Sequence, residues 1–327
     1  MKAKVISYGL LLVVTVIAYL IGNQFPLIGH SFAAIVLGMI VANTGLNRLY
    51  DARQMKKVSS LMLKVGVVLL GFTLSFDLLS TTALRAVPII LSVITGAFVT
   101  AFVVGKKLGV SVKSRWLIGA GTAICGGSAI AAVAPIIEAD EDDLTYAIST
   151  IFIYNLLALV LFPILARVFG LSDIAYGVFA GTAINDTSSV VAAGYQFSPL
   201  AGDTATLVKM VRTLMIVPTS LVAIYWRWQQ EGKAQKASYS LAKIFPTFIL
   251  FFIIAIVIAN VFALPSTFTD SVKQLSRLAL TFALAAVGMS VSFSELKKAG
   301  LKTIQLGGVT WSVVIVISLV MTQWLFG

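Results

Sequence analysis

Residues 121–132 read GTAICGGSAIAA, and residues 181–193 read GTAINDTSSVVAA. The two stretches share the lead Gly-Thr-Ala-Ile and then differ, one continuing with a glycine pair and the other with Asn-Asp-Thr-Ser-Ser. Paired glycines and clustered short polar side chains both weaken an α-helix. The consequence depends on the surrounding solvent, because unpaired backbone groups are tolerated in water and costly in a bilayer.

The composition of the chain is that of a membrane protein. Of its 327 residues, 59% are hydrophobic and only 11% are charged, against about 25% charged residues in a typical soluble domain. Long stretches such as 5–47, 116–137 and 144–166 contain no Asp, Glu, Lys or Arg. A helix needs about 20 apolar residues to cross a bilayer core. The sequence therefore predicts an all-α polytopic membrane protein, a single domain over 1–327 with about eleven transmembrane helices.

The basic residues indicate an orientation. Most of the 24 Lys and Arg residues fall in alternate loops between the predicted spans, and cytoplasmic loops retain positive charge during insertion. This pattern predicts a cytoplasmic N-terminus and an external C-terminus, with the acidic run 138–143 outside and the linker 227–243 inside. It also predicts that the two GTAI copies run in the same direction. The net charge of +11 then favours contact with anionic membrane lipid over nucleic-acid binding.

The two interruptions fall deep inside their predicted spans. Gly126 and Gly127 lie about 15 Å along the span that starts at Trp116, and Asp186 lies about 18 Å along the span that starts at Ile174. Non-helical backbone at this depth survives only where it lines a protein-enclosed or water-filled cavity. We therefore expect residues 124–128 and 184–188 to be non-helical or kinked and to line a shared polar cavity.

Charged residues near the breaks are the strongest candidates for function. A carboxylate at mid-depth costs at least ~2.5 kcal/mol and is usually tied to a partner or a transport pathway, which singles out Asp186. Lys209 and Arg212 are three residues apart, on one face of the next span. Either one of them pairs with Asp186, or the two offer a positive field to an anion. The full set of predicted binding residues is Thr122, Cys125, Gly126, Gly127, Ser128, Asn185, Asp186, Thr187, Ser188, Ser189, Lys209, Arg212, Ser290 and Ser292.

A second internal similarity links the two ends of the chain. GFTLSFDLL at 71–79 and GMSVSFSEL at 288–296 share the pattern G-x-[TS]-[LV]-S-F-x-x-L. In the predicted topology these copies run in opposite directions, which is typical of the inverted repeats of secondary transporters. We expect two such repeats, at about 27–169 and 174–327, with discontinuous helices meeting at the midplane.

With these segments in hand, the chain resembles the YeiH-type family of bacterial inner-membrane proteins, labelled sulfate exporters. The resemblance covers nearly the whole chain and is most specific at the ICGGSAIAA block. It implies a carrier in the bacterial inner membrane, with a fold similar to bile-acid, auxin-efflux and cation–proton antiporter families. Where that family has Ile-His-Asp, this chain has Ile184-Asn185-Asp186, which leaves Asp186 as the one acidic candidate in the core.

The leading hypothesis is a secondary transporter that exports a small anion, sulfate-like, sulfonate-like or organic, with H+ or Na+ as the coupling ion. Two alternatives remain open. One is a cation–proton antiporter with Asp186 binding the ion, and the other is an anion channel with the polar breaks as a selectivity ring. The sequence has no HExxH motif and no second mid-membrane Asp for a catalytic dyad, so we expect no enzyme, no cofactor and no metal site. A homo-oligomer is compatible with the pattern.

Overall fold

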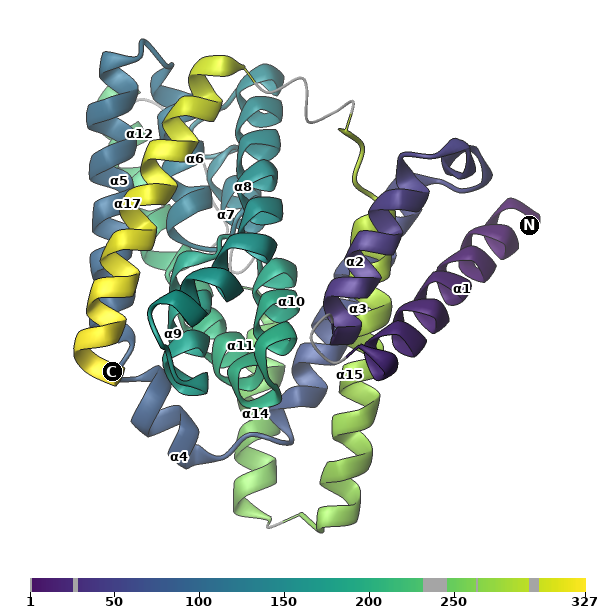
Figure 1. Ribbon diagram of the computed structural model, residues 1–327. Helices are drawn as coiled ribbons and strands as arrows, with labels where there is room; N and C mark the ends of the chain where they lie inside the picture. The colour runs from purple at the N-terminus through teal and green to yellow at the C-terminus, as the bar shows by residue number, and fades with distance from the viewer. Residues whose placement is uncertain (1, 26–28, 232–245, 263, 294–299) are drawn as a thin grey trace.

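The computed structural model describes residues 2–25, 29–231, 246–262, 264–293 and 300–327. In these ranges every regular element is a helix (Figure 1). One group of helices, the α15 group, contains α1 (Lys2–Gln24), α2 (Gly29–Ala42), α3 (Ala52–Gly71), α14 (Thr247–Val261) and α15 (Ser266–Met289). The short helices η1 (Gly45–Leu49), α4 (Phe76–Leu78) and η2 (Leu79–Ala83) link elements of this group to one another and to the rest of the protein.

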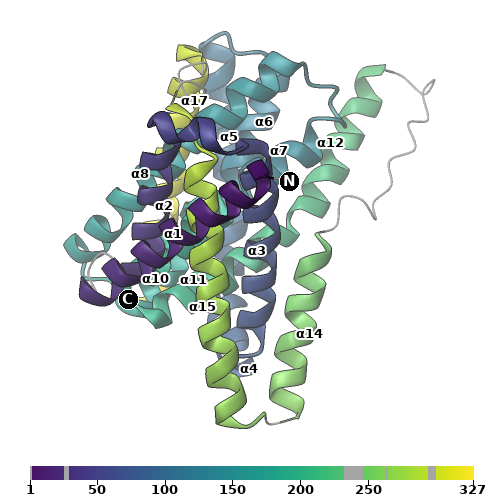
Figure 2. The same ribbon diagram turned by 90° about the vertical axis from the view of Figure 1, so that its right-hand side faces the viewer.

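The remaining helices form a second group, the α11 group, which packs beside the first (Figure 1). Its members are α5 (Val87–Lys107), α6 (Val112–Ala123), α7 (Gly127–Val133), α8 (Glu141–Val168), α9 (Asp173–Ala183), α10 (Thr187–Phe197), α11 (Pro199–Leu214), α12 (Ile216–Glu231) and α17 (Leu301–Phe326). The two groups meet where α10 contacts α2 and α15. Figure 2 shows the same arrangement from the side of the α15 group.

The lengths of these helices confirm a multi-pass membrane protein. Among the described residues, six helices are long and apolar enough to cross a bilayer: Ile6–Gln24, Val87–Lys107, Glu141–Val168, Pro199–Gln230, Ser266–Met289 and Leu301–Phe326. The helix pair Ala52–Gly71 and Phe76–Ala83 is bent by 107°, and His30–Ala42 and Thr247–Val261 are shorter apolar helices. The predicted count of about eleven spans is not reproduced, and two of the predicted spans take another form.

The predicted span 116–137 is a hairpin whose two ends lie at the same end of the protein. Trp116 near the start of α6 packs on Trp226 of α12, with ring centroids 5.5 Å apart. Beyond α7, Glu138 forms an ion pair with Arg227 at 2.5 Å, and Asp140 forms one with Lys113 at 3.3 Å. We call this end of the protein the Arg227 end. The prediction that the acidic run 138–143 and the basic residue Arg227 face opposite sides is therefore wrong.

The predicted span 174–196 is also a hairpin, and it enters from the opposite end. Tyr176 in α9 stacks on Phe197 at the end of α10, with centroids 4.2 Å apart, and its hydroxyl donates to the Ala193 carbonyl oxygen. α9 starts just after α8, which leaves the Arg227 end at Glu141 and runs for 28 residues, a length of about 42 Å. The two GTAI copies consequently run in opposite directions, which corrects the prediction that they run the same way.

Serine caps set where several of these helices begin. The Ser172 hydroxyl accepts a hydrogen bond from the Ala175 N–H at the start of α9, and the Ser198 hydroxyl accepts one from Ala201 at the start of α11. Such caps satisfy backbone donors that have no partner within the helix. At the C-terminal ends of α6 and α9 the last carbonyl oxygens also lack partners within the helix. Two buried cations bind these oxygens.

Candidate functional site

The tips of the two hairpins meet at Lys209, which lies on α11 and is fully buried. Its ammonium nitrogen is 2.6 Å from the carbonyl oxygen of Ile124, in the break of the first hairpin. The same nitrogen is 2.9 Å from the carbonyl oxygen of Ile184 and 2.5 Å from that of Asn185, in the break of the second hairpin. One side chain thus ties together two breaks that the chain places sixty residues apart.

Arg212, one turn further along α11 and also fully buried, binds the last turns of the same two half-helices. Its Nε donates to the Ala123 carbonyl oxygen at 2.7 Å, and its Nη2 donates to that of Thr122. Its Nη1 donates to the Ile184 carbonyl oxygen at 2.8 Å and to that of Gly181 at 3.4 Å. The guanidinium is therefore occupied by backbone acceptors from both hairpins.

These contacts explain the repeated Gly-Thr-Ala-Ile lead. The last carbonyls of any helix lack an intrahelical partner, and the C-terminus of a helix carries a partial negative charge. Here both C-termini are buried deep in an apolar protein, at residues 121–124 and 181–184. Cations are the stabilising partners for such ends, and Lys209 and Arg212 supply them. The prediction of a helix break in each stretch is confirmed, since α6 ends at Ala123 and α9 at Ala183. The breaks are shorter than the predicted 124–128 and 184–188, because α7 begins at Gly127 and α10 at Thr187.

Asp186 is bound to the start of α10 rather than to either cation. Its Oδ2 accepts hydrogen bonds from the Ser188 N–H at 2.9 Å and the Ser189 N–H at 3.3 Å, and from the Ser188 hydroxyl. It is thus the N-cap of this half-helix. No ion pair within the described part of the chain joins Asp186 to Lys209 or Arg212, so pairing with a cation, one of the two hypotheses for these residues, is not the observed arrangement.

At the equivalent position of the first hairpin, Gly126 takes the place of Asp186. Gly126 has φ 64° and ψ −126°, a conformation open to glycine and strained for other residues. It precedes α7 without a side-chain cap, and Gly127 and Ser128 that follow it are exposed. A Cβ atom added at Gly126 would lie 3.5 Å from Asp186. The two half-helix N-termini therefore face one another, one capped by a carboxylate and the other open.

One face of α7 and of the segment after it is accessible from the hairpin tip to the Arg227 end. The exposed residues recur at helical spacing and are small or at the surface: Gly127, Ser128, Ala131, Pro135 and Glu138. On the second hairpin, by contrast, residues 188–194 of α10 are all buried. The region of the tips is thus more accessible along α7 than along α10.

Two further polar side chains at the tips have no hydrogen-bond partner among the described residues. The Asn185 side chain is fully buried with both its amide nitrogen and its amide oxygen unpaired, and the buried hydroxyl of Thr122 is unpaired as well. Leaving a buried polar group unsatisfied costs about 1–3 kcal/mol. Such groups in a folded protein mark a place where a ligand or a solvent molecule can bind.

The remaining predicted residues divide into two sets. Cys125 is buried within the first break as a free thiol, and Thr187 is half-buried at the second. Ser290 and Ser292 lie just past the end of α15. The Ser290 hydroxyl donates to the Val287 carbonyl oxygen, and the residues on either side of Ser292 bind Asn43, which follows α2.

Sequence reasoning missed two residues that support the tips. Asn155 of α8 is buried, and its Oδ1 accepts a hydrogen bond from the Asp186 N–H at 3.2 Å. The Trp311 indole of α17 donates to the Ala183 carbonyl oxygen at 3.2 Å. Asn155 stands alone in the uncharged stretch 144–166, and an isolated amide in an apolar span could have been singled out on that ground.

A matched pair of asparagines was also missed. Asn43, which follows α2, donates from Nδ2 to the Val291 carbonyl oxygen at 3.0 Å, and its Oδ1 accepts from the Phe293 N–H at 2.8 Å. Asn260 of α14 makes the same two bonds to residues 74 and 76, at 2.9 and 3.0 Å. The two asparagines thus hold the corresponding residues of GFTLSF and GMSVSF. The matching tripeptides Val-Ala-Asn at 41–43 and Ile-Ala-Asn at 258–260 carried the signal.

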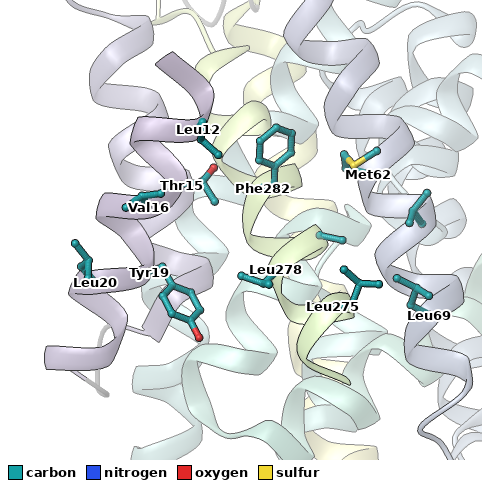
Figure 3. Close-up of a pocket in the computed structure, with 12 residues that line it drawn as sticks. Leu12, Thr15, Val16, Tyr19, Leu20, Met62, Leu69, Leu275, Leu278 and Phe282 are labelled. Atoms are coloured by element: carbon teal, nitrogen blue, oxygen red, sulfur yellow. The ribbon is translucent and has the colours of Figure 1, made fainter. Parts of the chain in front are cut away.

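An apolar groove of about 540 Å³ lies in the α15 group, away from the hairpin tips. α1 and α3 form its walls and α15 its floor, with Leu12, Val16, Leu69, Leu278 and Phe282 among the lining side chains (Figure 3). The described residues that line it contribute two hydroxyls, those of Thr15 and Tyr19, and that of Thr15 donates to the Leu11 carbonyl oxygen. This groove offers little to an ion and is not part of the candidate site.

The tips of the two hairpins bring together groups of opposite charge. Two buried cations and one carboxylate meet two helix N-termini and two helix C-termini, and the partial charges of the helix ends offset one another. Within the described residues no group of three or more His, Cys, Asp or Glu could hold a metal ion. Polar backbone, an amide and hydroxyls therefore remain as the groups that a ligand could contact.

Comparison with known proteins gives a consistent result. Residues 8–307 match the family model described as conserved hypothetical protein 698. The chain is 39% identical over 313 residues to a UPF0324 membrane protein of Streptococcus mutans, covering 92% of each chain. It is 37% identical over 327 residues to one of Streptococcus agalactiae, covering 98% of this chain and 97% of the relative. A UPF0324 membrane protein of Clostridium tetani is 36% identical over 340 residues, with 96% of each covered.

Proposed function

The chain belongs to the UPF0324 family of membrane proteins, the same family as the YeiH-type proteins, and on that premise we propose that it is a secondary active transporter of a small anion. The anion binds where the two hairpin tips meet, and the substrate class is sulfate-like, sulfonate-like or a small organic anion. Export is the direction that the family resemblance favours.

The observation that carries this proposal is the charge at the tips. Lys209 donates to three carbonyl oxygens, and only an ammonium has three N–H donors, since a neutral amine has two. Arginine stays protonated in proteins. Two positive charges therefore face the single carboxylate of Asp186, in a region where an uncompensated charge is costly. A bound monovalent anion, or one charge of a larger anion, restores neutrality.

The groups that contact the anion are those left open by the structure. The N-terminus of α7 is accessible at Gly127 and Ser128, and backbone N–H groups at the start of a helix favour negative charge. The unpaired amide of Asn185 adds a donor. Lys209 and Arg212 act at a distance, because their own donors are bound to the backbone. They supply the field, and the N–H and hydroxyl groups supply the contacts.

The arrangement also supports an inverted-repeat transporter fold. The hairpins run in opposite directions, and the matched bonds of Asn43 and Asn260 relate α2 and α3 to α14 and α15. The order along the chain differs between the halves, because the α6–α7 hairpin follows α2 and α3 whereas the α9–α10 hairpin precedes α14 and α15. Secondary transporters bind substrate at such a midplane junction and expose it alternately to each side by moving one part against the other. Here the α11 group carries the site and the α15 group is the part against which it moves.

We assign the Arg227 end to the cytoplasm. Lys106, Lys107, Lys113 and Arg115 lie at this end with Arg227, and cytoplasmic loops are enriched in Lys and Arg whether or not acidic residues accompany them. The accessible face of α7 then leads from the site to the cytoplasm. In this conformation the carrier receives its anion from the inside, as an exporter must.

A binding screen on the purified protein tests the anion site. Sulfate, sulfite, methanesulfonate and acetate are compared as choline salts, and the midpoint of thermal unfolding is measured. One anion class should raise the midpoint, because a ligand that binds only the folded state stabilises it. Stabilisation by Na+ with no response to any anion would instead favour a cation–proton antiporter.

Asn185→Leu separates binding from folding. Leucine has the same number and branching of side-chain heavy atoms as asparagine and leaves no amide unpaired, so the variant should be about as stable as the wild type in the absence of anion. Its stabilisation by the active anion should fall. Thr204→Val is the matched control, since Thr204 also has a buried, unpaired hydroxyl but lies on the part of α11 that faces Gly177. Equal anion responses in both variants would remove Asn185 from the site.

Proteoliposomes test the coupling. Among the residues that the structure describes at the tips, Asp186 carries the carboxylate, and we propose that it takes up the coupling proton. Asp186→Asn should abolish anion flux driven by a pH gradient while leaving exchange of labelled anion at equal concentrations measurable. Unchanged pH-driven flux would exclude Asp186 from coupling, and continuous ungated currents in the wild type would identify a channel.

A further inference from the structure

The environment of Lys209 has the composition of a cation site. The three oxygens that surround its ammonium nitrogen, at 2.5–2.9 Å, are all backbone carbonyls. They come from residues just past the C-terminal ends of α6 and α9, which enter from opposite ends of the protein. The Lys209 side chain is fully buried, so no solvent contributes to this environment.

Carbonyl oxygens in such a setting are suited to monovalent cations. Rings of backbone carbonyls replace the hydration shell of an ion in channels, and in transporters unwound carbonyls and half-helix C-termini bind Na+. A positive charge here has two effects. It binds the three carbonyl oxygens, and it offsets the partial negative charge of the two helix C-termini. Either a bound ion or a tethered ammonium can meet both needs, and this chain provides the ammonium.

Arg212 prevents a second cation from binding beside the first. Its guanidinium binds three further carbonyl oxygens of the same two half-helix ends, those of Thr122, Ala123 and Gly181, and shares the Ile184 carbonyl oxygen with Lys209. A soluble cation arriving at this junction would find the carbonyl oxygens already taken and two positive charges within a turn of α11. The junction is therefore filled by the protein's own cations.

We propose that the Lys209 ammonium occupies a latent monovalent-cation site and takes the place of a soluble coupling cation. One consequence of this inference rests on the proposed transport function: anion transport by the wild type should not require Na+. The site itself follows from the contacts alone. Removing the ammonium should convert the junction into a binding site for a free monovalent cation.

Chemical rescue of Lys209→Ala tests the site directly. The variant leaves the space of the side chain, the carbonyl oxygens of Ile124 and Asn185 without this donor, and that of Ile184 bound by Arg212 alone. The n-propylammonium ion matches the missing part of the side chain in shape and charge. Thermal unfolding is measured in equal concentrations of choline chloride, NaCl and n-propylammonium chloride. We expect n-propylammonium to raise the unfolding midpoint of the variant by several degrees over choline, with a smaller increase in NaCl. The midpoint of the wild type should be the same in all three salts.

Two control variants exclude a general salt effect. Lys64→Ala removes an exposed lysine from α3 and should respond to the salts as the wild type does. Lys209→Met removes the charge but fills the space, so it should be destabilised and not rescued. Rescue of Lys209→Met to the same extent as Lys209→Ala would overturn the proposal, as would a Lys209→Ala variant no more stable in either cation than in choline.

If Lys209→Ala does not yield folded protein, Lys209→Gln carries the test. The glutamine amide has two N–H donors and no charge. If the ammonium serves only as a hydrogen-bond donor, this variant should be insensitive to the cation, which would overturn the proposal. If it serves as a cation, NaCl should stabilise the variant over choline chloride.

A separate experiment tests whether transport requires Na+. Anion flux through wild-type proteoliposomes should be unchanged when Na+ is replaced by choline on both sides, and a requirement for Na+ would overturn the substitution of Lys209 for a coupling cation. Absence of any anion flux in either medium, together with rescue of Lys209→Ala, would instead refute the proposed function and leave the cation site standing.

Discussion

The α6–α7 and α9–α10 hairpins begin with the same four residues and end differently. Their C-terminal turns share the lead Gly-Thr-Ala-Ile and share both cations of α11. After the breaks, Asp186 caps α10 with its carboxylate, while Gly126 at the equivalent position leaves α7 uncapped and accessible. The comparison teaches that the shared lead goes with a shared contact, because both C-terminal turns bind the same two cations. The residues that follow differ, and so one hairpin has a capped helix start and the other an open one.

The largest effect is expected where the hairpins are alike. Arg212→Gln removes a buried charge that binds four carbonyl oxygens from both hairpins, and breaking such an arrangement costs about 3–5 kcal/mol. Thermal or denaturant unfolding of the purified protein measures the loss. Arg85→Gln is the control, since Arg85 is exposed and donates to the Leu325 carbonyl oxygen. Similar losses in the two variants would show that the Arg212 contacts add little.

Gly126→Ala sharpens the difference between the hairpins. The backbone at Gly126 has φ 64° and ψ −126°, and holding an alanine there costs about 1–3 kcal/mol. A Cβ at this position meets only ordinary contacts, so the loss would come from the backbone itself. Gly127→Ala is the matched control, because a Cβ there meets nothing within 4 Å and φ is not positive. Unfolding midpoints should fall for the first variant and stay level or rise for the second.

Asp186 at the equivalent position should show a smaller loss of a different origin. Asp186→Ala removes the N-cap of α10, which typically costs about 0.5–2 kcal/mol. Asp186→Asn keeps a side-chain oxygen for the Ser188 and Ser189 N–H groups and should retain most of the stability. The two variants are compared by thermal unfolding. If Asn proves as damaging as Ala, the negative charge matters to the fold, and the capping geometry does not account for this residue.

The smallest effect on stability is expected from labelling variants that test the direction of the first hairpin. In a Cys125→Ser background, cysteines placed at the exposed positions Asp142 and Gln230 should react with a membrane-impermeant maleimide from the same side of the membrane. Asp77→Cys, near the opposite end of the protein, should react from the other side. Labelling of positions 142 and 230 from opposite sides would restore the predicted full span at 116–137.

The sequence alone was enough to predict that this protein lies in a membrane and where its helices break. Composition and the long uncharged stretches predicted a helical, multi-pass membrane protein, because burying apolar surface in lipid needs no tertiary detail. The glycine pair and the polar cluster predicted breaks within 124–128 and 184–188, since helix propensity is local. The same reasoning identified Asp186, Lys209 and Arg212, because a charge at mid-depth always needs a partner.

Only the tertiary structure decided what those partners are and which way the chain runs. A broken apolar stretch of about 20 residues has the same sequence pattern whether it crosses the bilayer or turns back. Loop charge did not distinguish the two cases, because Glu138 and Asp140 of the acidic run pair with Arg227 and Lys113 at the same end. Likewise, the carbonyls that bind Lys209 and Arg212 belong to the backbone, which every sequence possesses. Their availability depends on where two helices end in space, so only the assembled fold reveals it.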